Sequence, residues 1–168
     1  MLIAFHGKPE IKQFYLERVR AHRAADEIIH GKYWEDGKGC AIGCTIHSGN
    51  HSAYETELGI PRIIARLEDR LFEGMTNSQA LDWPEQFLNA IPVSADLSLA
   101  WPRFAVWLMR EIEPFAKKSP ACQKSIRAIG DMYERVVAGE EIDAGHWLEA
   151  RRAASDAAFA AFAATSDA

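Results

Sequence analysis

Prolines and glycines divide this chain into segments of helical length, and this punctuation constrains the fold more than any other feature. A proline suits the first turn of a helix, where its missing N–H is not needed, and a glycine suits the position after the last turn. Such signals recur along the chain, at Pro9, Gly31, Gly59, Pro61, Gly74, Pro84, Pro102, Pro114, Pro120 and Gly139. They predict a succession of helices joined by short turns.

Apolar residues between these signals recur at three- and four-residue steps, the spacing of one helix face. We find no convincing strand, repeat or linker, and 168 residues fit one domain. The sequence therefore predicts a single all-α domain over residues 1–168, a multi-helix bundle or orthogonal array of about six or seven helices. The expected helices cover residues 10–30, 52–58, 62–73, 76–90 with a break at Pro84, 97–118, and two segments that follow Ser119 and Asp143.

Two of these helices carry specific expectations about burial. The segment 97–118 is apolar around most of its circumference, so we expect it at the centre of the fold, with Pro114 kinking or ending it. In the segment 62–73 we expect Ile63, Ile64, Leu67, Leu71 and Phe72 to be buried, and Arg66, Glu68, Asp69 and Arg70 to face water.

The charge of the chain excludes some classes of function. A formal net charge of -5 argues against general nucleic-acid binding, which needs a basic surface. No apolar run approaches the roughly 18 residues that span a bilayer, so we expect no membrane association. Three cysteines, an odd number, and an N-terminal segment without the apolar length of a signal peptide predict free thiols in a reducing cytoplasm.

Residues 37–51 hold four glycines, two of the three cysteines and two of the six histidines. Cys40, Cys44, His47 and His51 supply thiolate and imidazole, the ligands that zinc prefers, in the number that a closed site needs. We therefore consider a zinc or iron site here. Zinc fingers, however, place a dozen or more residues between their two ligand pairs, and this stretch does not.

One ion needs either a loop around it or ligands from another segment. In a continuous helix the four side chains would share a face but spread over about 16 Å of its axis. His22, Asp26 and His30 follow one another at four-residue steps on the first expected helix, so they are candidate further ligands or outer contacts. Glu55 is another, and a hydrolase site could use His22, His30, His47 and His51 instead.

Two other interpretations of the stretch stay open. Cysteine often behaves as a small buried hydrophobe, and the run of glycine, alanine and cysteine from Gly39 to Cys44 suits tight helix packing. The second interpretation is a redox-active pair formed by Cys40 and Cys44, although the thioredoxin motif has two intervening residues rather than three. Phosphate-binding loops, nucleophile elbows and the His-Glu-x-x-His motif are all absent from the sequence.

Part of the chain resembles an uncharacterised family of bacterial proteins. The residues concerned are Gly31-Lys32-Tyr33-Trp34, then Gly39-Cys40-Ala41-Ile42-Gly43-Cys44-Thr45 with His47 and His51, and then residues 54–61, so the resemblance covers roughly the first half. It implies a bacterial cytoplasmic protein and brings no activity, cofactor or catalytic residue.

These observations favour a helical module that binds a partner, with a second copy of itself as one such partner. The Ala-rich last helix and exposed aromatic residues would supply the surface of a homo-oligomer, because small residues let backbones approach and aromatic residues anchor interfaces. The alternative is a metal-binding protein or metal-dependent hydrolase that uses Cys40, Cys44, His47 and His51.

Overall fold

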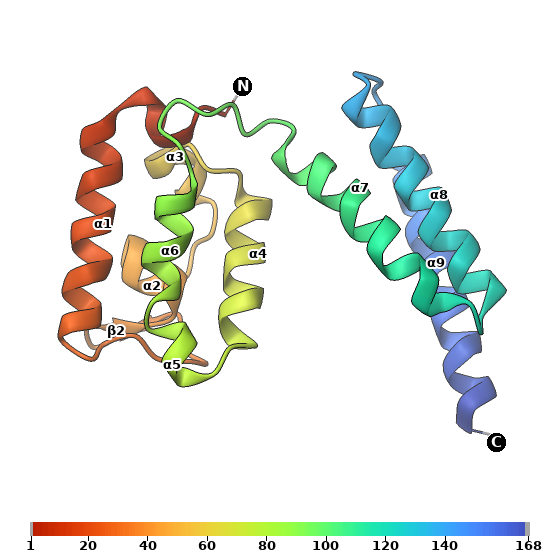
Figure 1. Cartoon of the computed structure of the whole chain (residues 1–168), viewed down its shortest axis with the longest axis horizontal. Helices are drawn as coiled ribbons and strands as arrows, with labels where there is room; N and C mark the ends of the chain where they lie inside the picture. Colours follow the sequence, from red (N-terminus) through yellow and green to blue (C-terminus); the bar gives the residue numbers. More distant parts are fainter. Residues whose placement is uncertain (1, 167–168) are drawn as a thin grey trace. The chain divides into compact units, whose positions relative to one another are not determined.

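The computed structural model describes residues 2–166 and is all-α, as predicted (Figure 1). Over these residues the chain forms nine α-helices, two short 3-10 helices and one sheet of two short strands. Six of the helices have seven or more residues, which agrees with the six or seven that were expected. No helix in the described part of the chain is both long and apolar enough to cross a bilayer.

The chain forms two compact units, which meet between Ser98 and Leu99 in the sequence. That residues 1–168 form a single domain stays a prediction. The sequence offered no signal for this division, because no run of Gly, Pro or Ser marks position 98.

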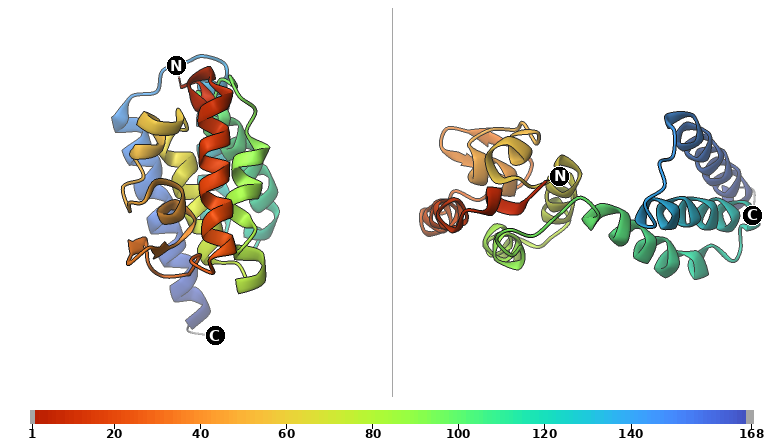
Figure 2. Two further views of the ribbon diagram at one scale, coloured as in Figure 1. Left: turned by 90° about the vertical axis from the view of Figure 1, so that its left-hand side faces the viewer. Right: turned by 90° about the horizontal axis from the view of Figure 1, so that it is seen from above.

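The N-terminal unit surrounds a short helix, α2 (Ala41–Ile46), that carries Cys44 and follows Cys40. Helix α2 packs against α1, α4 and α6, and all six of its residues are buried (Figures 1 and 2). The cysteine stretch is thus the centre of this unit. The elements are η1 (Ala4–Gly7), α1 (Pro9–Ala24), β1 (Trp34–Glu35), β2 (Lys38–Gly39), α2, α3 (Ala53–Leu58), α4 (Arg62–Glu73), α5 (Asn77–Ala80) and α6 (Trp83–Ala90).

Helix α1 ends at Ala24, six residues before the predicted end at His30. Asp26 adopts a left-handed conformation with φ of 56°, and the amides of Asp26 and Glu27 donate to the carbonyls of Arg23 and His22. This is the hydrogen-bond pattern with which many helices end, with aspartate in the position that glycine usually occupies. The prediction that Asp26 and His30 share a helix face with His22 is therefore wrong.

Residues 34–39 form a tight hairpin with Asp36 and Gly37 at its turn. Both turn residues have positive φ, 51° and 83°, which matches the twist of the paired strands β1 and β2. Strands of two residues each are too short to show alternation in a sequence, so the sequence shows no convincing sign of them.

Helix α4 has the predicted limits but a different buried face. Ala65, Glu68 and Phe72 are buried, whereas Ile63 and Leu71 are 38% and 44% exposed. The face that packs on α2 and α3 therefore includes a small residue and a carboxylate. Arg66 and Arg70 face water and Phe72 is buried, as predicted, whereas Glu68 was wrongly expected in water, because hydrophobic patterning does not mark a buried carboxylate.

The C-terminal unit contains α7 (Ala100–Ile112), η2 (Glu113–Ala116), α8 (Pro120–Val137) and α9 (Ala144–Ser166). Helix α8 packs against both α7 and α9 (Figure 2). Pro114 lies just after the end of α7, as predicted. The expectation that this apolar helix is central is wrong: Ala105 is its one buried residue, and Trp107 is 53% exposed. In a unit of three α-helices, the other two cannot cover all sides of a helix that is apolar around its circumference.

Candidate metal centre

The start of α2 is held by backbone contacts on both sides. The amide of Cys40 donates to the carbonyl of Lys32 at 2.7 Å, and Gly39 both donates to Glu27 and accepts from Ile29. Cys40 is extended and immediately precedes the first helical residue. The segment after α1 and the hairpin therefore fix the position of the cysteine backbone.

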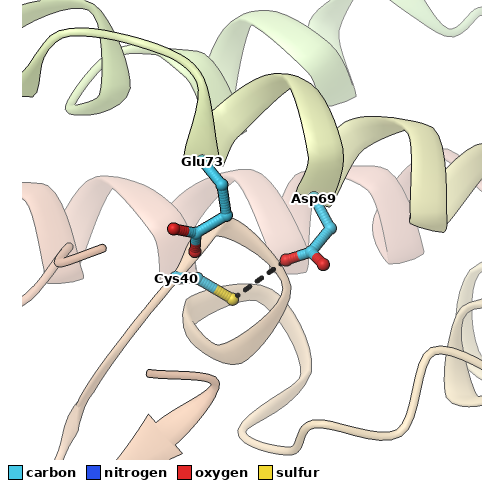
Figure 3. Close-up of side chains that lie close together, drawn as sticks. All are labelled: Cys40, Asp69 and Glu73. Atoms are coloured by element: carbon cyan, nitrogen blue, oxygen red, sulfur yellow. Dashed lines mark hydrogen bonds between the residues drawn. The ribbon is translucent and has the colours of Figure 1, made fainter. Parts of the chain in front are cut away.

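Cys40 lies beside two carboxylates of α4, Asp69 and Glu73 (Figure 3). One ligand atom from each of the three residues lies within 4.8 Å of the other two. The Sγ atom of Cys40 is 3.5 Å from Oδ1 of Asp69. Asp69 and Glu73 are four residues apart and share a face of α4, and the packing of α2 on α4 brings the thiol to that face.

Further contacts orient both carboxylates. The hydroxyl of Tyr33 donates to Oδ2 of Asp69 at 3.4 Å, and Nε2 of His51 is 3.4 Å from the same oxygen. The rings of Tyr33 and His51 meet edge to face. Glu73 accepts from the amide of Gly31, at 3.1 and 3.2 Å from its two oxygens. Each carboxylate is therefore positioned by groups outside α4.

Burial changes from one side of this group to the other. Cys40 is 1% exposed, the side chains of His51 and Asp69 are 14% and 17% exposed, and Glu73 is exposed. A hollow of about 220 Å³ opens beside the carboxylates, and its lining consists of Gly31, Lys32, Tyr33, Asp69, Arg70 and Glu73. The sulfur thus forms the floor of the group, and the carboxylates face the hollow.

Burial raises the pKa of the Cys40 thiol to about 12, since the charged thiolate is poorly solvated there. The negative charge of Asp69 acts in the same direction, while the amides of Gly43 and Ile42 favour the thiolate. Without a cation beside it, this thiol is protonated at neutral pH. A metal ion would have to displace the proton, so its affinity would rise with pH.

The structure does not bring the four predicted ligands together as one set. Cys40 and His51 both adjoin Asp69, but Cys44 donates to the carbonyls of Gly39 and Glu27, at 3.3 and 3.7 Å. Burial also raises the pKa of Cys44 to about 12. His47 lies at the other end of α2, where it contacts His22.

The predicted additional ligands have separate surroundings. His30 contacts the carbonyl of Phe72 through Nε2 at 3.1 Å, and its ring packs on the Phe72 ring. Glu55 accepts from the amide of Arg62 and so caps the start of α4. Asp26 is exposed at the end of α1. None of these three belongs to the group formed by Cys40, Asp69 and Glu73.

Asp69 and Glu73 were not predicted as ligands. The signal for them in the sequence is a pair of carboxylates four residues apart, which also occurs on many solvent-facing helices. Only the packing of α4 against the start of α2 distinguishes this pair.

Comparisons of this chain with protein-family models, with curated proteins and with solved structures found no match.

Proposed function

We propose that the N-terminal unit is a metal-binding module that holds one divalent ion, of the zinc or iron class, through Cys40, Asp69 and Glu73. The observation that carries this proposal is the convergence of one sulfur and two carboxylates, from two separate elements, within 4.8 Å. Zinc bonds of about 2.3 Å to sulfur and about 2.1 Å to oxygen place neighbouring tetrahedral ligands about 3.6 Å apart. The 3.5 Å between Cys40 Sγ and Asp69 Oδ1 already fits this spacing.

The local charge supports a cation. Asp69 and Glu73 carry like charges one turn apart, an arrangement that costs a few tenths of a kcal/mol on a helix. Among the described residues, His51 is the one basic side chain within ion-pair distance of Asp69, and Glu73 has none. A divalent ion would turn this repulsion into attraction.

A fourth position is available to His51 or to water. Three protein ligands and one open position characterise catalytic zinc sites, where the ion lowers the pKa of a bound water. The carboxylates face the hollow beside Lys32 and Arg70, so a small anionic molecule could approach. Metal-dependent hydrolysis is therefore the activity to test once binding is measured. A reducing cytoplasmic location, which the three free cysteines support, belongs to this proposal.

Elemental analysis of untagged protein, purified without chelator, tests the proposal. We expect about one ion per chain, which Cys40→Ser/Asp69→Asn loses and Cys44→Ser retains. The matched control is Cys122→Ser/Asp131→Asn, which makes the same two changes in α8. Metal-free protein that also fails to bind added Zn²⁺ in calorimetric titration would contradict the proposal, as would equal metal content in the two double variants.

A second candidate function is self-association through the C-terminal unit. Over the described part of that unit only Ala105 and Ala157 are buried, and α8 has no buried residue. Trp107 and Phe115 are 53% and 88% exposed. A unit of this size without a substantial core needs additional burial to be stable, and a second copy of its helices would provide it.

Sedimentation velocity of the full chain across the micromolar range tests self-association. We expect a dimer or larger species that dissociates on dilution, and we expect Trp107→Glu/Phe115→Glu to shift the equilibrium towards monomer. Lys117→Glu/Lys118→Glu, exposed charges between η2 and α8, is the control. A monomer at every concentration would contradict the idea.

A further inference from the structure

A second group of side chains lies at the other end of α2. His22, in the last turn of α1, and His47, just after α2, place their Nε2 atoms 2.8 Å apart. The Nδ1 atom of His22 is 2.6 Å from Oε2 of Glu27. The ring of His47 stacks on Trp34, with centroids 4.3 Å apart and planes 12° apart, and Trp34 also meets the edge of His22.

The hydrogen bonds of this group determine where its lone pairs point. The carboxylate of Glu27 can only accept, so Nδ1 of His22 carries the proton of that bond. A neutral His22 then has its lone pair on Nε2, directed at His47. In the other neutral imidazole, the facing Nε2 offers either a proton or a second lone pair. The two ligand nitrogens therefore face each other, and an ion that displaces the proton between them would contact both.

We propose that His22 and His47 form a second metal site, for a divalent ion that prefers imidazole, with Cu²⁺ bound more tightly than Zn²⁺. Metal-ligating histidines commonly donate their other ring nitrogen to a carboxylate, as His22 does to Glu27. Imidazole suits zinc and copper, and copper is bound most tightly in the divalent series. This site is separate from the one proposed at Cys40.

Binding requires the two rings to separate slightly and to turn, so that both lone pairs point at the ion. Two bonds of about 2.05 Å at a tetrahedral ion place the nitrogens about 3.3 Å apart, roughly half an ångström more than the 2.8 Å between them here. His47 is exposed, so the remaining positions on the ion are open to water. Trp34 restrains the His47 ring as it moves.

Charges near the pair act in both directions. Glu27 favours a cation, whereas the guanidinium of Arg18, which donates to the carbonyl of Thr45, opposes one. Arg18 is held against the rings of Phe14 and Tyr15. We therefore expect a site that binds copper detectably and that tightens when Arg18 is replaced by Gln.

The test uses Cu²⁺ alone, added to untagged full-length protein that carries Cys40→Ser/Asp69→Asn/Cys122→Ser. These changes remove the ligands proposed at the first site and a half-buried thiol that Cu²⁺ could oxidise. We expect one bound Cu²⁺ per chain and electron paramagnetic resonance splitting from two nitrogens. His22→Gln/His47→Asn should weaken binding at least about tenfold, and Glu27→Gln by about 10- to 100-fold.

The control is His146→Gln, which removes a surface histidine whose side chain pairs with neighbouring Asp143. Asparagine is chosen at position 47 because it tolerates the left-handed conformation found there. Circular dichroism verifies folding, and His47→Asn alone replaces the double variant if that one unfolds. Equal copper affinity of the histidine variant and the His146→Gln control would overturn the inference. The Cys40 site is disabled in every variant of this test. The copper result therefore does not depend on whether the proposed metal site at Cys40 exists.

Discussion

The carbonyl oxygen of Tyr33 occupies the space that a side chain at position 43 would need. A Cβ on Gly43 would lie 1.4 Å from that oxygen, and a Cβ on Gly39 would lie 2.1 Å from it. Two glycines four residues apart therefore let α2 pack directly on the backbone before the hairpin. Cys40 and His47 flank the two ends of this helix.

Gly43→Ala should destabilise the N-terminal unit by about 3 kcal/mol or more, because neither the backbone of Tyr33 nor the buried helix can move aside. Gly74→Ala is the control: its nearest neighbour would be 3.6 Å away, an ordinary contact, and its φ is negative. Urea unfolding measures both. Similar midpoints for the two variants would show that α2 can shift away from Tyr33.

Glu68 should make stability fall as pH rises. Its carboxyl is fully buried, neither oxygen has a hydrogen-bond partner among the described residues, and burial raises its pKa well above the usual value. Above about pH 4.5 the unfolded chain releases a proton that the folded chain retains, so stability decreases by up to about 1.4 kcal/mol per pH unit.

Glu68→Gln keeps a neutral side chain of the same shape and should flatten this dependence. Unfolding in urea between about pH 5 and about pH 8 measures the slope. Glu149→Gln, on the surface of α9, should leave the slope as in the unsubstituted chain. A steep fall that persists in Glu68→Gln would assign the pH dependence to another group.

Cys40 and Cys44 should react slowly with iodoacetamide. With a pKa of about 12, roughly one thiol in ten thousand is ionised near pH 8, and both sulfurs are buried. Cys122 is partly exposed and should be labelled first. Mass spectrometry of chelator-treated protein follows each cysteine. Faster labelling of the α2 pair would instead favour the redox interpretation.

Asp26→Gly should stabilise the chain by about 0.5 kcal/mol or more, since glycine has no steric cost at positive φ, whereas Asp26→Val should cost about 1–2 kcal/mol. Glu17→Gly, on the exposed face inside α1, should destabilise the chain by about 1 kcal/mol. Thermal unfolding of the three variants gives the signs. If Asp26→Gly lowered stability as Glu17→Gly does, the left-handed conformation of Asp26 at the end of α1 would be contradicted.

Local backbone preferences explain which parts of the fold were predictable. Helix α4 follows Pro61 and stops at Gly74, and α3 stops at Gly59, whose φ is 65°. Proline and glycine specify such ends without reference to the rest of the molecule. The end of α1 was missed because Asp26 adopts the left-handed conformation that glycine usually adopts at a helix end. An aspartate in the sequence does not signal that conformation.

The candidate site was predictable only in part, for a different reason. Cys40 and His51 stood out because cysteine and histidine are rare and chemically distinctive. Asp69 was expected in water, since a carboxylate on an amphipathic helix usually is. Its role depends on which face of α4 meets α2, and the buried face includes Glu68, which no hydrophobic pattern would select.

Helix α2 also offers a way to follow both proposed metals without a metal assay. All six residues of the helix are buried; the amide of Cys44, inside it, donates to the carbonyl of Cys40, and that of His47, just after it, donates to the carbonyl of Gly43. These protons can exchange with heavy water only when the unit opens. An ion held by the folded form at either end of α2 makes opening rarer, so both ions would slow the same exchanging amides.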